Sequence, residues 1–271
     1  MRGLAARSMV VAACLAALVA GPAASGAIGI VLPPAAAKAD YQLGGAYHPP
    51  AGTRIVERDR SDRPAIGVYG ICYLNGYQTQ PDERSWWTSR HSDLLLRDRN
   101  GRTVQDPGWP DELLLDTSTA ARRAAIARIE YAWIDGCARS GYRAIEVDNL
   151  DSWTRSRGLL RQDGNTALAR LLNSRAHLRG LASAQKNIPE IAPQGRRLGF
   201  DFAVAEECGV YAECASYTRV YGSRVIEVEY TDNGRAAFAR SCATAAGRRS
   251  ILLRDRMLTT TGTPGYAYRS C

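Results

Sequence analysis

Short apolar or alternating runs recur along the chain, and stretches with helical periodicity lie between the later ones. Three stretches, 119–140, 165–179 and 234–245, place apolar residues three or four positions apart, as in a helix with one buried face. Eight runs have the length and composition of strands, at 41–45, 54–58, 65–75, 142–148, 181–186, 200–206, 224–230 and 250–254. Strands that alternate with helices indicate βα units and a parallel sheet.

The number of predicted strands favours a closed barrel. Eight strands suggest a single, compact α/β domain, a (β/α)₈ TIM-type barrel near the short end of that fold's size range. A doubly wound open sheet is the alternative, although the phosphate-binding pattern G-x-G-x-x-G is absent from the sequence. One connection, 76–118, is much longer than the others and contains the turn signal Asn100-Gly101. Long loops in compact domains are usually functional.

The N-terminus has the features of a secretory signal. Positive residues precede the apolar stretch 9–20, and the small-x-small tripeptide 37–39 precedes Asp40. We therefore expect a signal peptide over 1–39, a barrel domain over 40–271, and secretion to the outside of the cell. A retained N-terminal anchor is the alternative, which the short apolar stretch disfavours.

Six cysteines follow this segment, and an even number in an exported chain suggests up to three disulfides. Sequence alone leaves the pairing open among 15 possibilities. Proximity and the position of the C-terminus favour the pairs Cys208–Cys214, Cys242–Cys271 and Cys72–Cys137. A zinc site is the alternative, but the sequence has no C-x-x-C and its three histidines are scattered. We expect no metal and no cofactor.

The net charge of +8 does not indicate a nucleic-acid partner, because the arginines are spread along the chain and aromatic residues do not interleave with them. We expect no nucleic-acid binding, no stable membrane association after signal cleavage, and a monomer.

Carboxylates gather where three predicted strands end, which is the end of a barrel that carries enzyme sites. In 142–148, Glu146 and Asp148 alternate with apolar residues, so we expect the acids to line the barrel mouth and the apolar face to meet the helices. The other acids at such ends are Asp151, Glu206, Glu207, Glu227, Glu229 and Asp232. Buried acids are costly unless they are used or paired. Asp148 and Glu206 are the best catalytic candidates, whereas Glu207, Glu227 and Asp232 fit structural roles better.

Two carboxylates that face each other across a barrel mouth suit glycoside cleavage, since one attacks or activates water and the other protonates the leaving oxygen. Tryptophans in the predicted loops, among them Trp86 and Trp109, would pack against sugar rings or cover the barrel edge. Lys186 is a lone lysine near a strand end, and it would neutralise neighbouring carboxylates or, less readily, form a Schiff base.

With these residues the chain resembles glycoside hydrolase family 114, the endo-α-1,4-polygalactosaminidase-like barrels, from about residue 41 to residue 271. The matching segments are Tyr41-Gln42-Leu43-Gly44-Gly45, Ile71-Cys72-Tyr73-Leu74, Glu146-Val147-Asp148-Asn149-Leu150-Asp151, Gln185-Lys186-Asn187, Ala205-Glu206-Glu207-Cys208 and Glu229-Tyr230. The resemblance implies a (β/α)₈ fold and hydrolysis of α-1,4-linked galactosamine-rich exopolysaccharide. It places the nucleophile at Asp148 and the acid/base at Glu206, with retention or inversion depending on their separation.

The resemblance and the loop aromatics together predict the substrate contacts Gln42, Tyr73, Trp86, Trp109, Glu146, Asn149, Asp151, Lys186, Asn187, Glu229 and Tyr230. One point conflicts with strand alternation, which puts Glu206 on the face of Phe202 and Val204 and so favours Glu207 as the inward acid. The resemblance favours Glu206. A non-catalytic exopolysaccharide-binding barrel and a Schiff-base lyase that uses Lys186 are the alternative functions.

Overall fold

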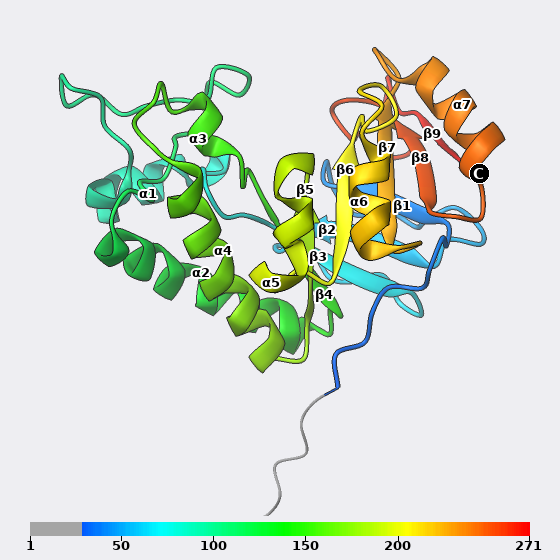
Figure 1. The fold of residues 1–271 in the computed structure, drawn as a ribbon, viewed down its shortest axis with the longest axis horizontal. Helices are drawn as coiled ribbons and strands as arrows, with labels where there is room; N and C mark the ends of the chain where they lie inside the picture. Colours follow the sequence, from blue (N-terminus) through cyan, green and yellow to red (C-terminus); the bar gives the residue numbers. More distant parts are fainter. Residues whose placement is uncertain (1–28) are drawn as a thin grey trace, which may run out of the picture.

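The computed structural model describes residues 29–271, in which one sheet of parallel strands curls into a barrel (Figure 1). Strands β1 to β8 are hydrogen-bonded in sequence order, and β9 is antiparallel to β8. Their bounds are β1 Ala39–Gln42, β2 Ile55–Asp59, β3 Tyr69–Asn75, β4 Ala144–Asp148, β5 Ala182–Lys186, β6 Phe202–Glu206, β7 Val225–Tyr230, β8 Ser250–Arg254 and β9 Tyr268–Ser270. The predicted TIM-type barrel and its eight parallel strands are confirmed, whereas β9 was not predicted.

Helices cover the barrel unevenly. They are α1 Arg84–Arg90, α2 Ala120–Ser140, α3 Ser152–Arg155, α4 Gln162–Leu178, α5 Gly195–Leu198, α6 Cys214–Tyr221 and α7 Arg235–Ala245, with short 3-10 helices at Pro81–Glu83, Ser92–Leu94 and Pro189–Gln194. The helix α2 begins where the Thr119 side chain accepts a hydrogen bond from the Arg122 N–H, and it ends at Gly141 in the left-handed conformation. Loops alone join β1 to β2 and β2 to β3. The three predicted helices, all between later strands, are confirmed as α2, α4 and α7.

Both faces of strands β1 to β8 are buried, and apolar residues lie on both faces of the sheet. The barrel interior holds alternate residues of each strand, among them Ile55, Ile71, Ala144, Ala184, Phe202, Val204, Ile226, Val228 and Leu252. The opposite face packs against the helices through residues such as Ile145, Val147, Ala203 and Ala205. The interior is therefore apolar below the mouth on several strands.

Side chains, rather than direct pairing of β8 with β1, close the barrel. The buried Arg254 of β8 donates from Nη1 to Asp40 Oδ1 at 3.2 Å and also to the Tyr41 carbonyl. Its Nε donates to the Ala267 carbonyl at 3.0 Å, next to β9. Tyr268 of β9 donates to the Ala39 carbonyl at 2.9 Å. The unpredicted ninth strand thus fills the seam of the barrel.

Three disulfides fasten this architecture, and all three predicted pairs are confirmed. They join Cys72 to Cys137, Cys208 to Cys214, and Cys242 to Cys271. The first ties β3 to α2, the second closes the loop between β6 and α6, and the third holds the C-terminus to α7. Disulfides of this kind stabilise mainly by restricting the unfolded chain.

The segment before β1 lies against the barrel at the end opposite the mouth. Ile30 and Leu32 pack on the interior core, the Tyr69 hydroxyl donates to the Val31 carbonyl at 2.7 Å, and the N–H of Ala36 donates to Ser223. Ala39 is 3% exposed and belongs to β1. Residues 1–28 of the predicted signal lie outside the described residues. The predicted cleavage before Asp40 would cut inside β1, so this position does not suit the fold.

The long connection 76–118 forms one side of the molecule with α1 and two short 3-10 helices. Isolated antiparallel bridges, such as Gln78 with Leu114 and Arg97 with Thr103, hold it together. Gly101 has φ of 77°, as the predicted Asn-Gly turn requires. Within residues 29–271, every helix is too short or too polar to cross a bilayer.

Candidate active site

A pocket of about 480 Å³ opens at the C-terminal ends of the strands. The strands contribute Asp59 from β2, Tyr73 from β3, Asp148 from β4, Glu206 from β6 and Tyr230 from β7, with Tyr41 from β1. The loop 76–118 supplies one wall through Gln80, Pro81, Asp106, Gly108, Trp109 and Glu112. This position agrees with the end of a TIM-type barrel at which enzymes build their sites.

The ammonium of Lys186 lies at the centre of the mouth, just below the pocket. Its Nζ is 2.9 Å from Glu146 Oε1, 3.1 Å from Asp148 Oδ1 and 3.4 Å from Glu206 Oε2, and the side chain is 2% exposed. Burial alone would lower the pKa of Lys186, but the three carboxylates outweigh burial and raise that pKa well above its usual range. Lys186 is therefore a permanent cation that neutralises carboxylates. A Schiff base would require a neutral amine.

Asp148 is held as a carboxylate. The Tyr73 hydroxyl donates to its Oδ2 at 2.9 Å, and the backbone N–H of Asn149 donates to its Oδ1 at 2.6 Å. Burial would raise the pKa of Asp148, but Lys186 and the Asn149 N–H outweigh burial and lower it. Asn149 has φ of 63°, so the chain turns sharply directly after the strand and brings its N–H to the carboxylate.

Glu206 is fixed from two neighbouring strands. The Tyr230 hydroxyl of β7 donates to its Oε1, and Asn187 Nδ2 donates to its Oε2 at 3.1 Å. Asn187 also accepts from the backbone N–H of Glu206 at 2.9 Å, so one side chain positions both the peptide and the carboxylate. Asn187 directly follows β5 and has φ of 51°. The left-handed residues Asn149 and Asn187 therefore each donate a hydrogen bond to one of the two carboxylates.

The shared contact with Lys186 limits how far apart these carboxylates lie. Because Asp148 Oδ1 and Glu206 Oε2 are 3.1 and 3.4 Å from the same nitrogen, their separation is about 6.5 Å at most, the lower limit for inverting glycosidases. The separation of Asp148 and Glu206 therefore fits retaining glycosidases, whose two carboxyl groups lie about 5–5.5 Å apart, better than inverting ones.

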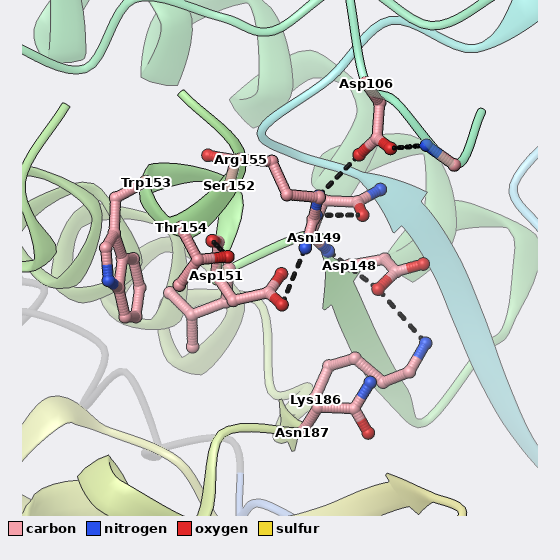
Figure 2. A network of polar contacts seen from close by, with 12 residues as sticks. Asp106, Asp148, Asn149, Asp151, Ser152, Trp153, Thr154, Arg155, Lys186 and Asn187 are labelled. Carbon is pink, nitrogen blue, oxygen red and sulfur yellow. Dashed lines mark hydrogen bonds and ion pairs between the residues drawn. The ribbon is translucent and has the colours of Figure 1, made fainter. Parts of the chain in front are cut away.

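A polar network links the long loop to the end of β4 (Figure 2). Arg155 of α3 contacts Asp106 of the loop, donates to Asn149 Oδ1 at 2.9 Å, and forms an ion pair with Asp151 at 2.7 Å. Figure 2 shows Asp106, Arg155 and Asn149 in one line above Asp148 and Lys186. Asp106 and Arg155 were not predicted, because the contact that joins them links residues 49 positions apart in the sequence.

Glu112 adds a titrating acid to the same wall. Asn75 donates to its Oε2 at 2.9 Å, and burial raises the pKa of Glu112 to about 7 against the lowering effect of that bond. Among the described residues, neither Glu112 nor Asp59 forms an ion pair with a basic side chain, although Gln80 donates to Asp59 at 2.8 Å. The pocket therefore carries negative charge that its own arginines and lysine do not neutralise.

Comparison with known families agrees with this geometry. The model of glycoside-hydrolase family GH114 matches residues 20–271. The chain belongs to glycoside-hydrolase family GH114. It is a glycoside hydrolase by this membership, as the facing carboxylates of β4 and β6 suggest. No curated protein matches the chain.

Solved structures share the fold of this GH114 barrel. Aspergillus fumigatus Ega3 in complex with galactosamine matches with a TM-score of 0.70 and 20% identity, over 90% of this chain and 98% of that chain. The glycoside hydrolase domain of PelA from Pseudomonas aeruginosa matches with a TM-score of 0.56 and 17% identity, over 83% of this chain and 97% of that chain. At these identities the likeness establishes the fold.

In the GH114 barrel, the inward acid of β6 is Glu206, as the resemblance implied and contrary to strand alternation. Strand alternation favours Glu207 only if the apolar face of β6 points outward. Phe202 and Val204 instead lie in the barrel interior, with Glu206 above them. Glu207 has φ of 56° and turns away to form an ion pair with Arg256 at 2.8 Å. The structural role of Glu207 stays a prediction, which this ion pair supports.

The apolar face of β7 also points into the barrel, and not toward the helices as expected. Ile226 and Val228 face the interior, so Glu227 and Glu229 lie behind the strand and away from the pocket. Glu229 Oε1 accepts from the Gly209 N–H at 2.8 Å, and Glu227 is paired with Arg249. The predicted substrate contact at Glu229 is corrected to a support for the loop after β6.

Three other predicted contacts also lie outside the pocket. Gln42 is fully buried between Arg58 and Asp40. Glu146 lies below the pocket, where it contacts Lys186 and Tyr41. The ring of Trp86 packs against other aromatic rings, those of Trp87, His91 and Trp133.

The remaining predicted contacts belong to the mouth. Lys186 lies just beneath its floor, and the pocket lining includes Tyr73, Trp109, Asn149, Asp151, Asn187 and Tyr230. Trp109 is 47% exposed at the rim. Among the described residues, one group of metal-type ligands occurs, Cys208, Cys214 and Glu227, and its two sulfurs are bonded to each other.

Proposed function

We propose that this protein is a secreted glycoside hydrolase that cleaves internal α-1,4 linkages of galactosamine-rich exopolysaccharide. The observation that carries the proposal is the position of the Lys186 ammonium between Asp148 and Glu206 at the barrel mouth. Family membership supplies the reaction class, and the galactosamine complex of Ega3 supports the sugar.

In this proposal Asp148 is the nucleophile and Glu206 the acid/base. An oxygen of Asp148 bonds to the anomeric carbon as the bond from that carbon to the glycosidic oxygen breaks, and Glu206 gives its proton to the leaving oxygen. Water then releases the sugar from Asp148 and returns a proton to Glu206. The lowered pKa of Asp148 suits the nucleophile, since it is ionised at neutral pH. Lys186 offsets repulsion between the two carboxyl groups.

The charge of the pocket supports a cationic substrate. Asp59 and Glu112 line it, and neither has a basic partner within residues 29–271, whereas galactosamine carries a positive charge at neutral pH. N-acetylation removes that charge. We therefore expect deacetylated polymer to be cleaved with a lower KM than its acetylated form, and with a dependence on salt.

The shape of the mouth supports cleavage inside a polymer. A second hollow adjoins the pocket and shares Asp151, Asn187 and Glu206 with it. Trp109 stands at the rim of the first hollow and the exposed Tyr211 beside the second, where each ring could pack against a sugar. A chain can thus continue on both sides of the carboxylates.

Product analysis tests this proposal. The oxidised protein is incubated with partly deacetylated α-1,4-galactosaminogalactan oligomers, and the products are measured by mass spectrometry. Oligomers of intermediate length support internal cleavage. Retention of polymer in a pull-down without shorter products would instead support the non-catalytic binding barrel, and trapping by borohydride would support the lyase that uses Lys186.

Secretion requires a cleavage position that the fold tolerates. Residues 30–38 contact the barrel floor, so we propose that processing occurs upstream of Ile30, where Ser25-Gly26-Ala27 is another small-x-small tripeptide. The intact mass of the exported protein measures this directly. An intact mass equal to that of a chain that starts at Asp40 would contradict the proposal. The monomeric state stays a prediction.

A further inference from the structure

Two buried carboxyl groups, those of Glu57 and Glu146, lie in the barrel beneath the proposed catalytic pair. Glu57 of β2 is 2% exposed, and neither of its oxygens accepts a hydrogen bond from an N–H or hydroxyl group within the described residues. Glu146 of β4 is fully buried, and its Oε2 is equally without such a donor. Tyr41 links the two: it is the register partner of Glu57 in the pairing of β1 with β2, and its hydroxyl donates to Glu146 Oε1 at 3.1 Å.

Two ionised carboxylates cannot share such a site without a large cost. Burial removes water from both groups, and their like charges repel each other in a medium of low polarity. The charged and titratable groups that act on Glu57 are Tyr41, Tyr142, Glu146, Asp148 and Lys186. Lys186 is the one cation of this set, and it already contacts three other carboxylates.

One proton removes both difficulties. If Glu57 is the carboxylic acid, its O–H donates to the unmet oxygen of Glu146, and no like-charge contact remains. The other oxygen of Glu146 accepts from Lys186 at 2.9 Å and from the Tyr41 hydroxyl at 3.1 Å, as a carboxylate should. Burial, and then the charge of Glu146, raise the pKa of Glu57 well above its usual range.

We propose that Glu57 is a neutral carboxylic acid that donates to Glu146 and thereby positions Lys186 between Asp148 and Glu206. Glu57 does not line the pocket, so it is a positioning residue and not a catalytic one. Its effect on catalysis rests on the proposed function, whereas its protonation does not.

Folding stability tests the protonation without any substrate. Glu57→Gln keeps a neutral donor of the same size but cannot titrate. The folded protein holds the Glu57 proton above pH of about 4.3, where the unfolded chain releases it. The unfolding constant of the wild type should therefore rise relative to that of Glu57→Gln by up to tenfold for each pH unit above that value. Parallel stability curves would overturn the proposal.

Activity tests the positioning role, with Glu57→Leu beside Glu57→Gln. Glu57→Leu removes the donor, so Glu146 takes up a proton and leaves the Lys186 charge to Asp148 and Glu206. We expect kcat/KM to fall roughly 10- to 100-fold and its acidic limb to move to lower pH, whereas Glu57→Gln keeps the wild-type profile. Equal loss in both variants would overturn the role, because Glu57 would then be needed as an anion.

Glu130 provides the matched control. It is another fully buried carboxyl group without a donor among the described residues, but it lies on α2, outside the pocket lining. Glu130→Leu should change stability and leave the pH profile of activity unmoved. A Glu57→Leu variant that also keeps the wild-type profile would show a merely structural role. If the wild type cleaves no polymer, the proposed function fails while the stability curves still decide the protonation of Glu57.

Discussion

The strands β4 and β7 have almost the same sequence pattern and use it in opposite directions. Residues 144–148 read Ala-Ile-Glu-Val-Asp, and residues 226–229 read Ile-Glu-Val-Glu. In β4 the acids point into the barrel, where Lys186 meets both. In β7 they point outward, where Glu227 forms an ion pair with Arg249 and Glu229 accepts a hydrogen bond from the Gly209 N–H.

The difference shows what alternation along a strand can establish. It separates residues into two faces, but both faces of a barrel strand are buried, so it does not say which one points inward. The partner decides whether an inward acid is tolerated. On β5, next to β4, Lys186 supplies a cation inside the barrel, whereas the interior beside β7 is formed by residues such as Val204 and Leu252.

The largest effect should come from neutralising one acid of each strand. Asp148→Asn removes the proposed nucleophile, so we expect kcat/KM on deacetylated oligomers to fall roughly 10⁴-fold. Glu229→Gln changes an acid behind β7 and should stay within a few-fold of the wild type. Initial rates with folded variants check both, and a dead Glu229→Gln beside an active Asp148→Asn would reverse the comparison.

The next effect separates the adjacent acids after β6. Glu206→Gln removes the proposed proton donor and should lower kcat/KM roughly 10²- to 10⁴-fold. Glu207→Gln weakens the ion pair with Arg256 and should alter activity only slightly. The pair is assayed on the same oligomers. Loss of activity in Glu207→Gln alone would mean that the assignment of the inward acid is incorrect.

Replacing the basic partners of the β4 and β7 acids, Lys186 and Arg249, should have different effects on stability and activity. Lys186→Met leaves buried carboxylates without their partner, which typically costs about 3–5 kcal/mol. It also raises the pKa of Asp148, so the acidic limb of activity should move to higher pH. Arg249→Met should lower stability and leave that limb in place. Denaturant titrations and pH profiles measure the two effects, and matching pH profiles would contradict the role of Lys186.

The smallest effect is a difference in the pH dependence of stability. The lowered pKa of Asp148 contributes stability above its unfolded value of about 3.9, and this contribution is lost as the pH falls. Burial raises the pKa of Glu229 to about 8, so its contribution is present below about 4.3 and is lost as the pH rises toward 8. The stability difference between the wild type and Asp148→Asn, measured from unfolding midpoints, should therefore shrink as the pH falls below about 3.9. The difference between the wild type and Glu229→Gln should instead grow as the pH rises from about 4.3 toward 8. The opposite trends would contradict these assignments.

Much of the barrel could be predicted from the sequence, because strand and helix periodicity alternate strongly after residue 119. The seam could not, since it depends on Arg254 meeting Asp40 and Tyr41 across the whole length of the chain. The contacts of the segment 30–38 with the barrel floor could not be predicted either, because they are not visible in a linear pattern.

The candidate site was predictable where a strand-end motif carried it, as for Asp148, Lys186 and Glu206. In the long loop, the aromatic Trp109 was predicted, but the acids Asp106 and Glu112 were missed because the path of the loop over the mouth has no periodic signal. Glu57 was missed for another reason. It lies in β2 beside the charged residues Arg58 and Asp59, so in the sequence it resembles a surface acid and differs from one only by its burial.

The stereochemistry of the first product tests the catalytic assignment most directly. Proton nuclear magnetic resonance can follow the anomeric signal of the new reducing end as α-linked oligomers are cleaved by the wild-type protein. Asp148 as nucleophile and Glu206 as acid/base predict that the α anomer forms first and then mutarotates. An initial β anomer would mean direct attack by water and would contradict the assignment of Asp148 as the nucleophile.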